Sequence, residues 1–102
     1  MTIIELNAQS WHSWEDFYSA LLAALGAPKS HGRNLNALID SMVWGGMNAV
    51  EPPYKIRVLG TENLSEDIRA EIDVVKQALA NARAERRASG GPDVEIGLEI
   101  TS

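Results

Sequence analysis

Hydrophobic and polar residues follow two different periods along this chain. Three short stretches rich in β-branched and aliphatic residues, at 2–7, 54–59 and 94–100, are typical of β-strands, and the last one alternates strictly. The longer stretches between them repeat apolar residues at helical spacing. Because helices rather than tight turns separate the strands, we expect them to run parallel. The pattern predicts an α/β fold, in which a small three-stranded parallel sheet packs with three to four helices.

Two of the predicted helices have clear boundaries. The first follows Ser13 and ends at Gly26, residue types that favour the N-terminal and C-terminal caps of a helix. The longest follows Ser65 and ends at the Gly-Gly-Pro sequence of residues 90–92. Residues spaced by three and four form the apolar faces: Phe17, Leu21 and Leu25 in the first helix, and Ile68, Ile72, Val75, Leu79 and Ala82 in the longest. The aromatic residues around the first helix are interpreted as packing residues: Trp11, Trp14 and Tyr18.

A third helix is predicted to begin after the capping residue Asn34 and to run to about Trp44. Its apolar stripe consists of Leu35, Leu38, Ile39, Met42 and Val43. Asn36 and Asp40 are four residues apart, so they share the polar face of this helix. That face is either solvated or a binding surface, and periodicity alone favours solvation. Trp44 extends the apolar stripe, which favours a position in the core over one at an interface.

The composition excludes several classes of function. The chain of 102 residues has no cysteine, which excludes disulfides, thiolate catalysis and cysteine-based metal sites. No apolar run is long enough to span a membrane, and the first residues lack the features of a signal peptide. The net charge of −5 disfavours direct contact with nucleic acid and suits a basic partner, although solubility alone explains it better. We expect one domain, residues 1–102, in the cytoplasm.

The sequence holds few groups for catalysis. His12 and His31 show no metal-ligand spacing, and no nucleophile or second carboxylate accompanies them. A His31–Asp40 acid–base pair stays open as an alternative. The turn at Gly32 precedes a helix start that could bind an anion, but no strand precedes it and the nucleotide-binding glycine motifs are absent. We predict that the protein is not an enzyme and that it has no metal site and no cofactor.

One compact motif occupies the start of the central helix. It consists of Gly32, Asn34, Leu35, Ala37, Leu38 and Asp40, and it is followed by Gly45 and Gly46 and then by Pro52 and Pro53 before the next strand. This motif resembles the barstar family of ribonuclease inhibitors, and the order of the predicted elements fits that family as well. The resemblance implies a barstar-like fold. It also implies a cis peptide bond before Pro52 or Pro53.

The resemblance implies how such a protein works. In barstar-like inhibitors the central helix and the preceding turn plug the active site of a ribonuclease. Asp40 matches the anion that meets the basic residues of that active site. Gly32 and Arg33 match contacts at the turn, and Trp44 or Gly46 matches the far end of the interface. The predicted partner-binding residues are Asp40, Asn36, His31, Gly32, Arg33, Ser30, Trp44, Gly46 and Glu85.

Several of these positions depart from the family. Ser30 and His31 stand where the family has aromatic residues, and Asn36 stands where it has a second aspartate. A family glutamate near the end of the last helix matches Glu85 or Arg86. Because the missing charge weakens the match to a barnase-like active site, the sequence favours inhibition of a different nuclease or toxin.

Two functions follow from this interpretation. The first is an intracellular inhibitor or immunity protein that blocks a cognate basic ribonuclease or toxin, as in a toxin–antitoxin pair. The alternative is a divergent barstar-fold interaction or regulatory module that no longer inhibits a ribonuclease. Such a module would use the same helix or the Trp-rich first helix. For the inhibitor we expect a monomer or a weak homodimer, and a stable dimer that buries the central helix would favour the alternative.

Overall fold

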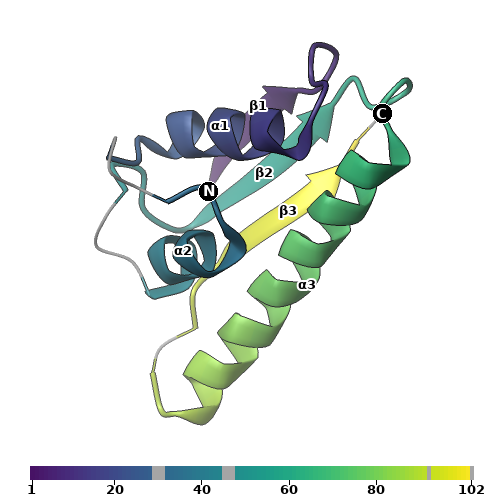
Figure 1. Cartoon of the computed structure of the whole chain (residues 1–102). Coiled ribbons are helices and arrows are strands. Elements are labelled where there is room, and N and C mark those ends of the chain that lie inside the picture. Colours follow the sequence, from purple (N-terminus) through teal and green to yellow (C-terminus); the bar gives the residue numbers. More distant parts are fainter. Residues whose placement is uncertain (29–31, 45–47, 92, 102) are drawn as a thin grey trace.

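The computed structural model describes residues 1–28, 32–44, 48–91 and 93–101 of the chain. The described elements are β1 (Thr2–Asn7), α1 (Trp14–Leu25), α2 (Leu35–Ile39), the π-helix η1 (Asp40–Trp44), β2 (Tyr54–Leu59), α3 (Glu66–Ala88) and β3 (Ile96–Ile100). Figure 1 shows them from the purple N-terminal strand to the yellow C-terminal strand. This order of strands and helices is the one that the sequence predicts.

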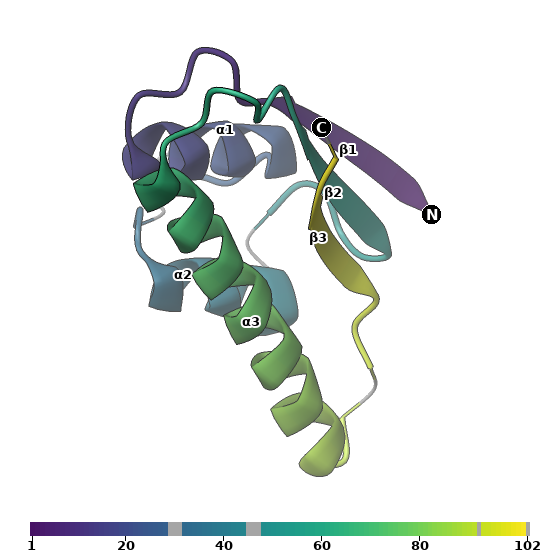
Figure 2. The ribbon, with the colours of Figure 1, turned by 90° about the vertical axis from the view of Figure 1, so that its right-hand side faces the viewer.

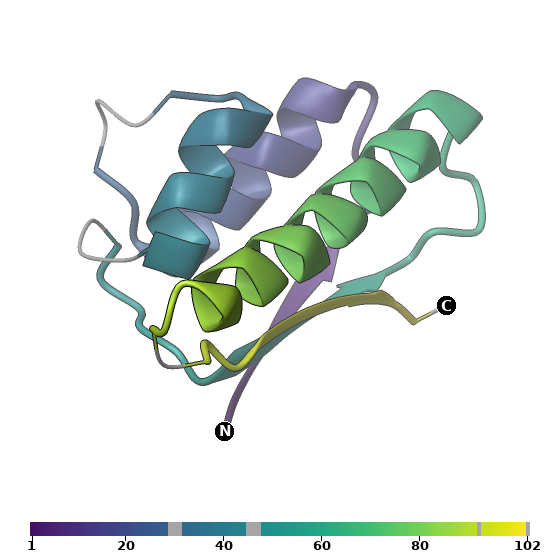
Figure 3. The same cartoon turned by 90° about the horizontal axis from the view of Figure 1, so that it is seen from below.

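The strands form one parallel sheet in the order β1-β2-β3, so β2 is the central strand. The pairing runs in register from Ile4 through Ile56 to Leu98. The described helices all cover the same face of this sheet, as Figure 2 and Figure 3 show from two directions. The arrangement confirms the predicted α/β class with a three-stranded parallel sheet.

The hydrophobic core lies between that face and the helices. The sheet contributes Ile56 and Val58, both 0% exposed, because alternate residues of a strand point to the same side. The helices contribute the apolar faces that their spacing predicts, including Phe17, Leu21, Leu25, Ile72 and Val75. Each such side chain stabilises the fold by about 1.5–3 kcal/mol through burial. The core therefore fixes the positions of the helices relative to the sheet.

A polar contact also joins two of these helices. The Tyr18 hydroxyl of α1 donates a hydrogen bond of 2.7 Å to Oε1 of Glu71 on α3. The pKa of the Tyr18 hydroxyl is raised above its ordinary value. Burial is the larger cause, and the neighbouring Glu71 carboxylate is the smaller one. Of the three predicted packing aromatics around α1, Tyr18 is buried and Trp11 packs against the core, but Trp14 remains 45% exposed and rests edge-on against Tyr18.

The opposite face of the sheet is polar and carries a ladder of charges. The register places Arg57 between Glu5 and Glu99. Nε of Arg57 lies 3.0 Å from Oε1 of Glu99, and Nζ of Lys55 lies 3.9 Å from Oε2 of the same carboxylate. These side chains are more than a third exposed, so each pair contributes less than about 1 kcal/mol. Glu99 of β3 thus pairs with two basic residues of β2.

The structure refines two expectations outside the central helix. The last strand begins at Ile96 rather than at residue 94, because Ile96 N–H bonds to the carbonyl of Val94 and bends the chain there. The cis peptide bond lies between Pro52 and Pro53. The short segment after β2 forms a single turn, closed by a hydrogen bond of 3.1 Å from Leu64 N–H to the Thr61 carbonyl.

The C-terminal end of α3 is tied to the approach to β3 by Asp93. Its carboxylate pairs with Arg83 at 3.0 Å and with Arg87 at 3.2 Å. Hydrogen bonding to the Arg83 guanidinium is the main cause that holds the pKa of Asp93 below its ordinary value of 3.8. A carboxyl whose pKa is lowered by folding stabilises the fold fully when the pH is above the ordinary pKa. This contribution is lost as the pH falls through the lowered pKa of the folded protein.

Replacing Asp93 by asparagine should therefore destabilise the protein at neutral pH and have little effect in strong acid. We expect urea denaturation midpoints of the variant to lie below those of the wild type near pH 7 and to converge with them near pH 2. A midpoint difference that stays the same at both pH values would show that the charge of Asp93 does not support this end of the helix.

Candidate partner-binding site

The central helix begins where a side chain caps it. Asn34 has extended backbone angles, φ −147° and ψ 164°, and its Oδ1 accepts a hydrogen bond of 2.9 Å from Ala37 N–H. Gly32 approaches this cap closely, because a Cβ on Gly32 would lie 2.8 Å from Nδ2 of Asn34. Leu38, which is 0% exposed, then anchors the helix in the core. The motif at residues 32–38 thus fixes where α2 starts and which way it faces.

The predicted single helix changes character at Asp40. Residues 35–39 form α2 and residues 40–44 form the π-helix η1, in which hydrogen bonds reach five residues instead of four. Each residue of a π-helix rotates less around the axis, so three consecutive side chains face inward: Ser41, Met42 and Val43. The Ser41 hydroxyl donates a hydrogen bond of 3.1 Å to the Leu38 carbonyl. Short π segments of this kind are often found at functional sites.

The prediction that Trp44 belongs to the core is wrong. Its side chain is 52% exposed at the end of η1. Helical spacing does not place Trp44 on the apolar stripe, because nine residues after Leu35 is about two and a half turns of an α-helix and therefore its opposite side. The result is an exposed aromatic side chain one turn beyond Asp40.

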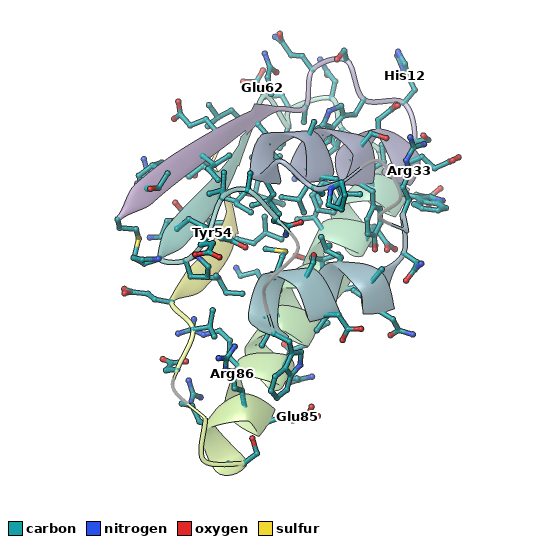
Figure 4. All side chains as sticks on the ribbon, turned by 90° about the vertical axis from the view of Figure 1, so that its left-hand side faces the viewer. His12, Arg33, Tyr54, Glu62, Glu85 and Arg86 are labelled. Carbon is teal, nitrogen blue, oxygen red and sulfur yellow. The ribbon has the colours of Figure 1, made fainter. Side chains whose placement is uncertain are left out.

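The polar face of α2 borders an open hollow against α3. The hollow has a volume of about 490 Å³ and is lined by Leu35, Asn36, Ile39, Asp40, Ala78, Asn81, Ala82 and Glu85. Asn36 and Asp40 are exposed on one side, and Asn81 and Glu85 on the other. Each helix thus presents an asparagine followed four residues later by an acid. In Figure 4 Glu85 and Arg86 project from the C-terminal half of α3, below α2.

The two acids of this hollow form no ion pair with a described residue. Among the residues that the structure describes, no Lys, Arg or His nitrogen lies within 4.0 Å of the Asp40 or Glu85 carboxylate. Two exposed carboxylates near each other create a negative potential that attracts a cationic group. The backbone beneath Asp40 is held by the buried side chains of η1. The arrangement offers a fixed anion to a basic partner.

The structure brings together part of the predicted partner-binding set. Asp40, Asn36 and Glu85 line one hollow, and Gly32 and Arg33 lie exposed just before the helix cap. Ser30, His31 and Gly46 lie outside the described residues. The alternative His31–Asp40 pair therefore stays a prediction as well.

Asn81 was not singled out from the sequence, and Arg86 was named there only as a possible match to the family glutamate. Asn81 lines the hollow one turn before Glu85, and its Oδ1 accepts a hydrogen bond of 3.1 Å from Gln77 Nε2. Its spacing of four from Glu85 is the signal that could have revealed it. Arg86 reaches from α3 to the end of η1, a contact between distant residues that periodicity within one helix does not predict.

The structure adds two findings on other kinds of site. In the described ranges no three His, Asp or Glu side chains come together as metal ligands. Over the same residues, none of the helices combines the length and the apolar character needed to cross a bilayer.

One of the comparisons with known proteins identifies a family for this chain. A comparison with curated protein sequences gives no match. The family model of Barstar (barnase inhibitor) matches residues 1–96, which includes every strand and helix up to the start of β3. A match of that extent covers the fold and the hollow beside Asp40 together. The chain belongs to the Barstar family.

Proposed function

We propose that this protein is an intracellular inhibitor, or immunity protein, of a cognate basic ribonuclease or toxin. It blocks the active site of that partner through the turn and helices around residues 30–46. The observation that carries the proposal is Asp40, an exposed carboxylate without a described ion pair on a helix that the core holds in place. Membership of a family described as barnase inhibitors supports the same function.

A fixed carboxylate suits this task for a physical reason. The active site of a ribonuclease holds a phosphate with basic side chains, and an inhibitor gains affinity by offering an anion at that place. Because Leu38 and the buried side chains of η1 position the backbone beneath Asp40, little conformational freedom is lost on binding. Glu85 adds a second negative charge across the hollow. Together they present a compact anionic surface to a basic site.

The overall charge supports the same kind of partner. Fourteen acidic and nine basic residues give the chain a net charge of −5, which accelerates its encounter with a basic protein. Salt screens such attraction over about 10 Å at 0.1 M. The association rate should therefore fall when the ionic strength is raised.

The two asparagines of the hollow distinguish this surface from a fully acidic one. Asn36 and Asn81 present neutral amides where a partner with several clustered cations would favour carboxylates. We infer that the partner has fewer basic groups at this place than a barnase-like ribonuclease, or places polar groups opposite the amides.

Restoring a charge at one of these positions tests that inference. We expect Asn36→Asp to strengthen binding to a barnase-type ribonuclease by about 1 kcal/mol, roughly fivefold, and to leave binding to the cognate partner within about twofold. Calorimetric titration of both partners with wild type and variant makes the comparison. Equal strengthening toward both would mean that the cognate partner is as cationic here as the barnase-type enzyme.

A second candidate function rests on a different observation. Trp14 on α1 is 45% exposed, which would suit the alternative of an interaction module that has lost the ribonuclease target. The two functions differ in the oligomeric state that they predict. A stable homodimer that buries Trp14 or the polar face of α2 would favour the module over the inhibitor.

The direct test is capture of the partner from the lysate of the cell that makes this protein. We expect tagged wild-type protein to retain a basic nuclease or toxin, and Asp40→Ala to lose it. Glu62→Ala is the matched control, since it also removes one exposed carboxylate, and Figure 4 places Glu62 at the opposite end of the molecule from Glu85. Retention that ignores Asp40 would contradict the proposed function.

A further inference from the structure

The exposed side chain of Trp44 is held by Arg86 of α3. The guanidinium carbon of Arg86 lies 5.5 Å from the centre of the Trp44 ring, within the range of a cation–π contact. Nη1 of Arg86 also donates a hydrogen bond to the carbonyl of Val43, the residue before Trp44. Arg86 therefore contacts both the backbone at the end of η1 and the indole that projects from it.

Arg86 is itself held in this position. Gly91 packs against its side chain, because a Cβ on Gly91 would lie 3.1 Å from Cγ of Arg86. Gly91 N–H also donates a hydrogen bond of 3.0 Å to the Arg86 carbonyl. The neighbouring Arg83 and Arg87 are both paired with Asp93. Within the described part of the chain no carboxylate lies within 4.0 Å of Arg86, and its guanidinium contacts Val43 and Trp44 of η1.

We propose that Arg86 is a positioning residue that presents the Trp44 indole as the aromatic contact of the partner-binding surface, beside the anionic contact Asp40. This inference rests on the proposed function and adds the chemistry of the partner. Asp40 and Trp44 are the first and last residues of η1. The partner accordingly carries a basic group and, about one helical turn away from it, an apolar recess that accepts an indole.

The chemistry of binding surfaces explains why the pair of Trp44 and Arg86 suits an interface. Tryptophan and arginine are the residues that most often dominate binding energy, because they bury large areas in a few well-packed contacts. An indole that is exposed in the free protein offers a partner a large apolar area with a polar N–H at its edge. The guanidinium covers one region of the ring and restricts its rotamers, so less side-chain entropy is lost when the partner binds.

The first part of the test uses the free protein. We expect the indole N–H signal of Trp44 and the side-chain signals of Arg86 to show mutual contacts by NMR in the wild type. Arg86→Met should remove these contacts and broaden or shift the Trp44 signal, and Arg86→Lys should retain them only in part, because an ammonium lacks the planar fork. Gly91→Ala, which crowds Arg86 without touching Trp44, should shift the same signals. Unchanged Trp44 signals in all three variants would overturn the positioning role.

The second part measures binding of the partner that the wild-type protein captures and the Asp40→Ala variant does not. Trp44→Ala should weaken it about 30-fold or more, and Arg86→Met about three- to tenfold. The effect of Arg86→Met should nearly vanish in the Trp44→Ala background, since the arginine acts through the indole. Ile3→Ala is the control and should leave binding unchanged, because it removes an exposed apolar side chain from the face of the sheet that the helices do not cover.

The outcomes separate this inference from the proposed function. If Asp40 is required for binding but Trp44→Ala binds as tightly as the wild type, the aromatic contact is refuted and the inhibitor function stands. If Arg86→Met weakens binding equally with and without Trp44, Arg86 contacts the partner directly and the positioning role is refuted. If the wild type retains no partner, both proposals fail together.

Discussion

Replacing Asp40 by alanine is expected to weaken binding of the cognate partner by about 3–5 kcal/mol, roughly a hundredfold to several thousandfold. The reason is that a basic group of the partner, buried on binding, would be left without its counter-charge. Desolvating an unpaired cation costs more than the pair itself gains, so the loss exceeds what an exposed ion pair contributes. Calorimetric titration, or surface-based measurement of the dissociation rate, provides the number.

Two comparisons make the Asp40 result specific. The Asp40→Asn variant keeps the size of the side chain but removes its charge. It should lose most of the same affinity, because the partner recognises the negative charge. Glu62→Ala removes an exposed carboxylate elsewhere and should change the affinity by less than about 1 kcal/mol. If Asp40→Ala costs no more than this control, Asp40 is not buried against a cation in the complex.

Replacing Leu38 by alanine is expected to destabilise the free protein by about 2–5 kcal/mol. Leu38 is 0% exposed and is the one fully inward-facing side chain of the short α2, so its loss leaves a cavity under the helix that carries Asp40. A lower urea midpoint with an unchanged slope would report this loss. The variant should also bind the partner less tightly under conditions in which it remains folded, since α2 would lose its anchor.

The control for Leu38 is an exposed aliphatic residue. Val74 on α3 is 47% exposed, and Val74→Ala should change the free energy of unfolding by less than about 0.5 kcal/mol. A loss below about 1 kcal/mol for Leu38→Ala would mean that α2 is positioned by other contacts. The fixed presentation of Asp40 would then need a different explanation.

Elements with long, regular patterns could be predicted closely from the sequence. The apolar seam of α3 and its cap at Ser65, whose Oγ accepts a hydrogen bond from Ile68 N–H, follow directly from spacing and residue type. The parallel sheet followed from strands separated by helices. In these segments local preference and tertiary packing favour the same structure, which is why the prediction succeeds.

The π-helix could not be predicted in this way. Spacing of three and four residues describes an α-helix, and nothing in residues 40–44 alone indicates a wider turn. The π turn places Ser41, Met42 and Val43 against the core. Near its end, Arg86 of α3 donates a hydrogen bond to the carbonyl of Val43. Because these interactions come from segments distant in sequence, the π turn and the contact of Arg86 with Trp44 became visible only in the folded structure.

The candidate site was predicted in part. Asp40 and Asn36 were placed on one face by their spacing, and the resemblance to the barstar family brought Glu85 to the same surface. The structure adds Asn81 beside Glu85 and gives Gly32 a structural role next to the Asn34 cap. A close approach of this kind depends on the local path of the backbone, which residue patterns do not specify.

The most direct test of the inhibitor function is to titrate the captured partner with this protein while following the partner's activity on RNA. We predict a linear loss of activity that is complete at one equivalent of wild-type protein, and no loss at the same concentration of Asp40→Ala. A partner that stays active when it is saturated with wild-type protein would contradict the account. Binding would then be established without inhibition, and the chain would be an interaction module with the barstar fold.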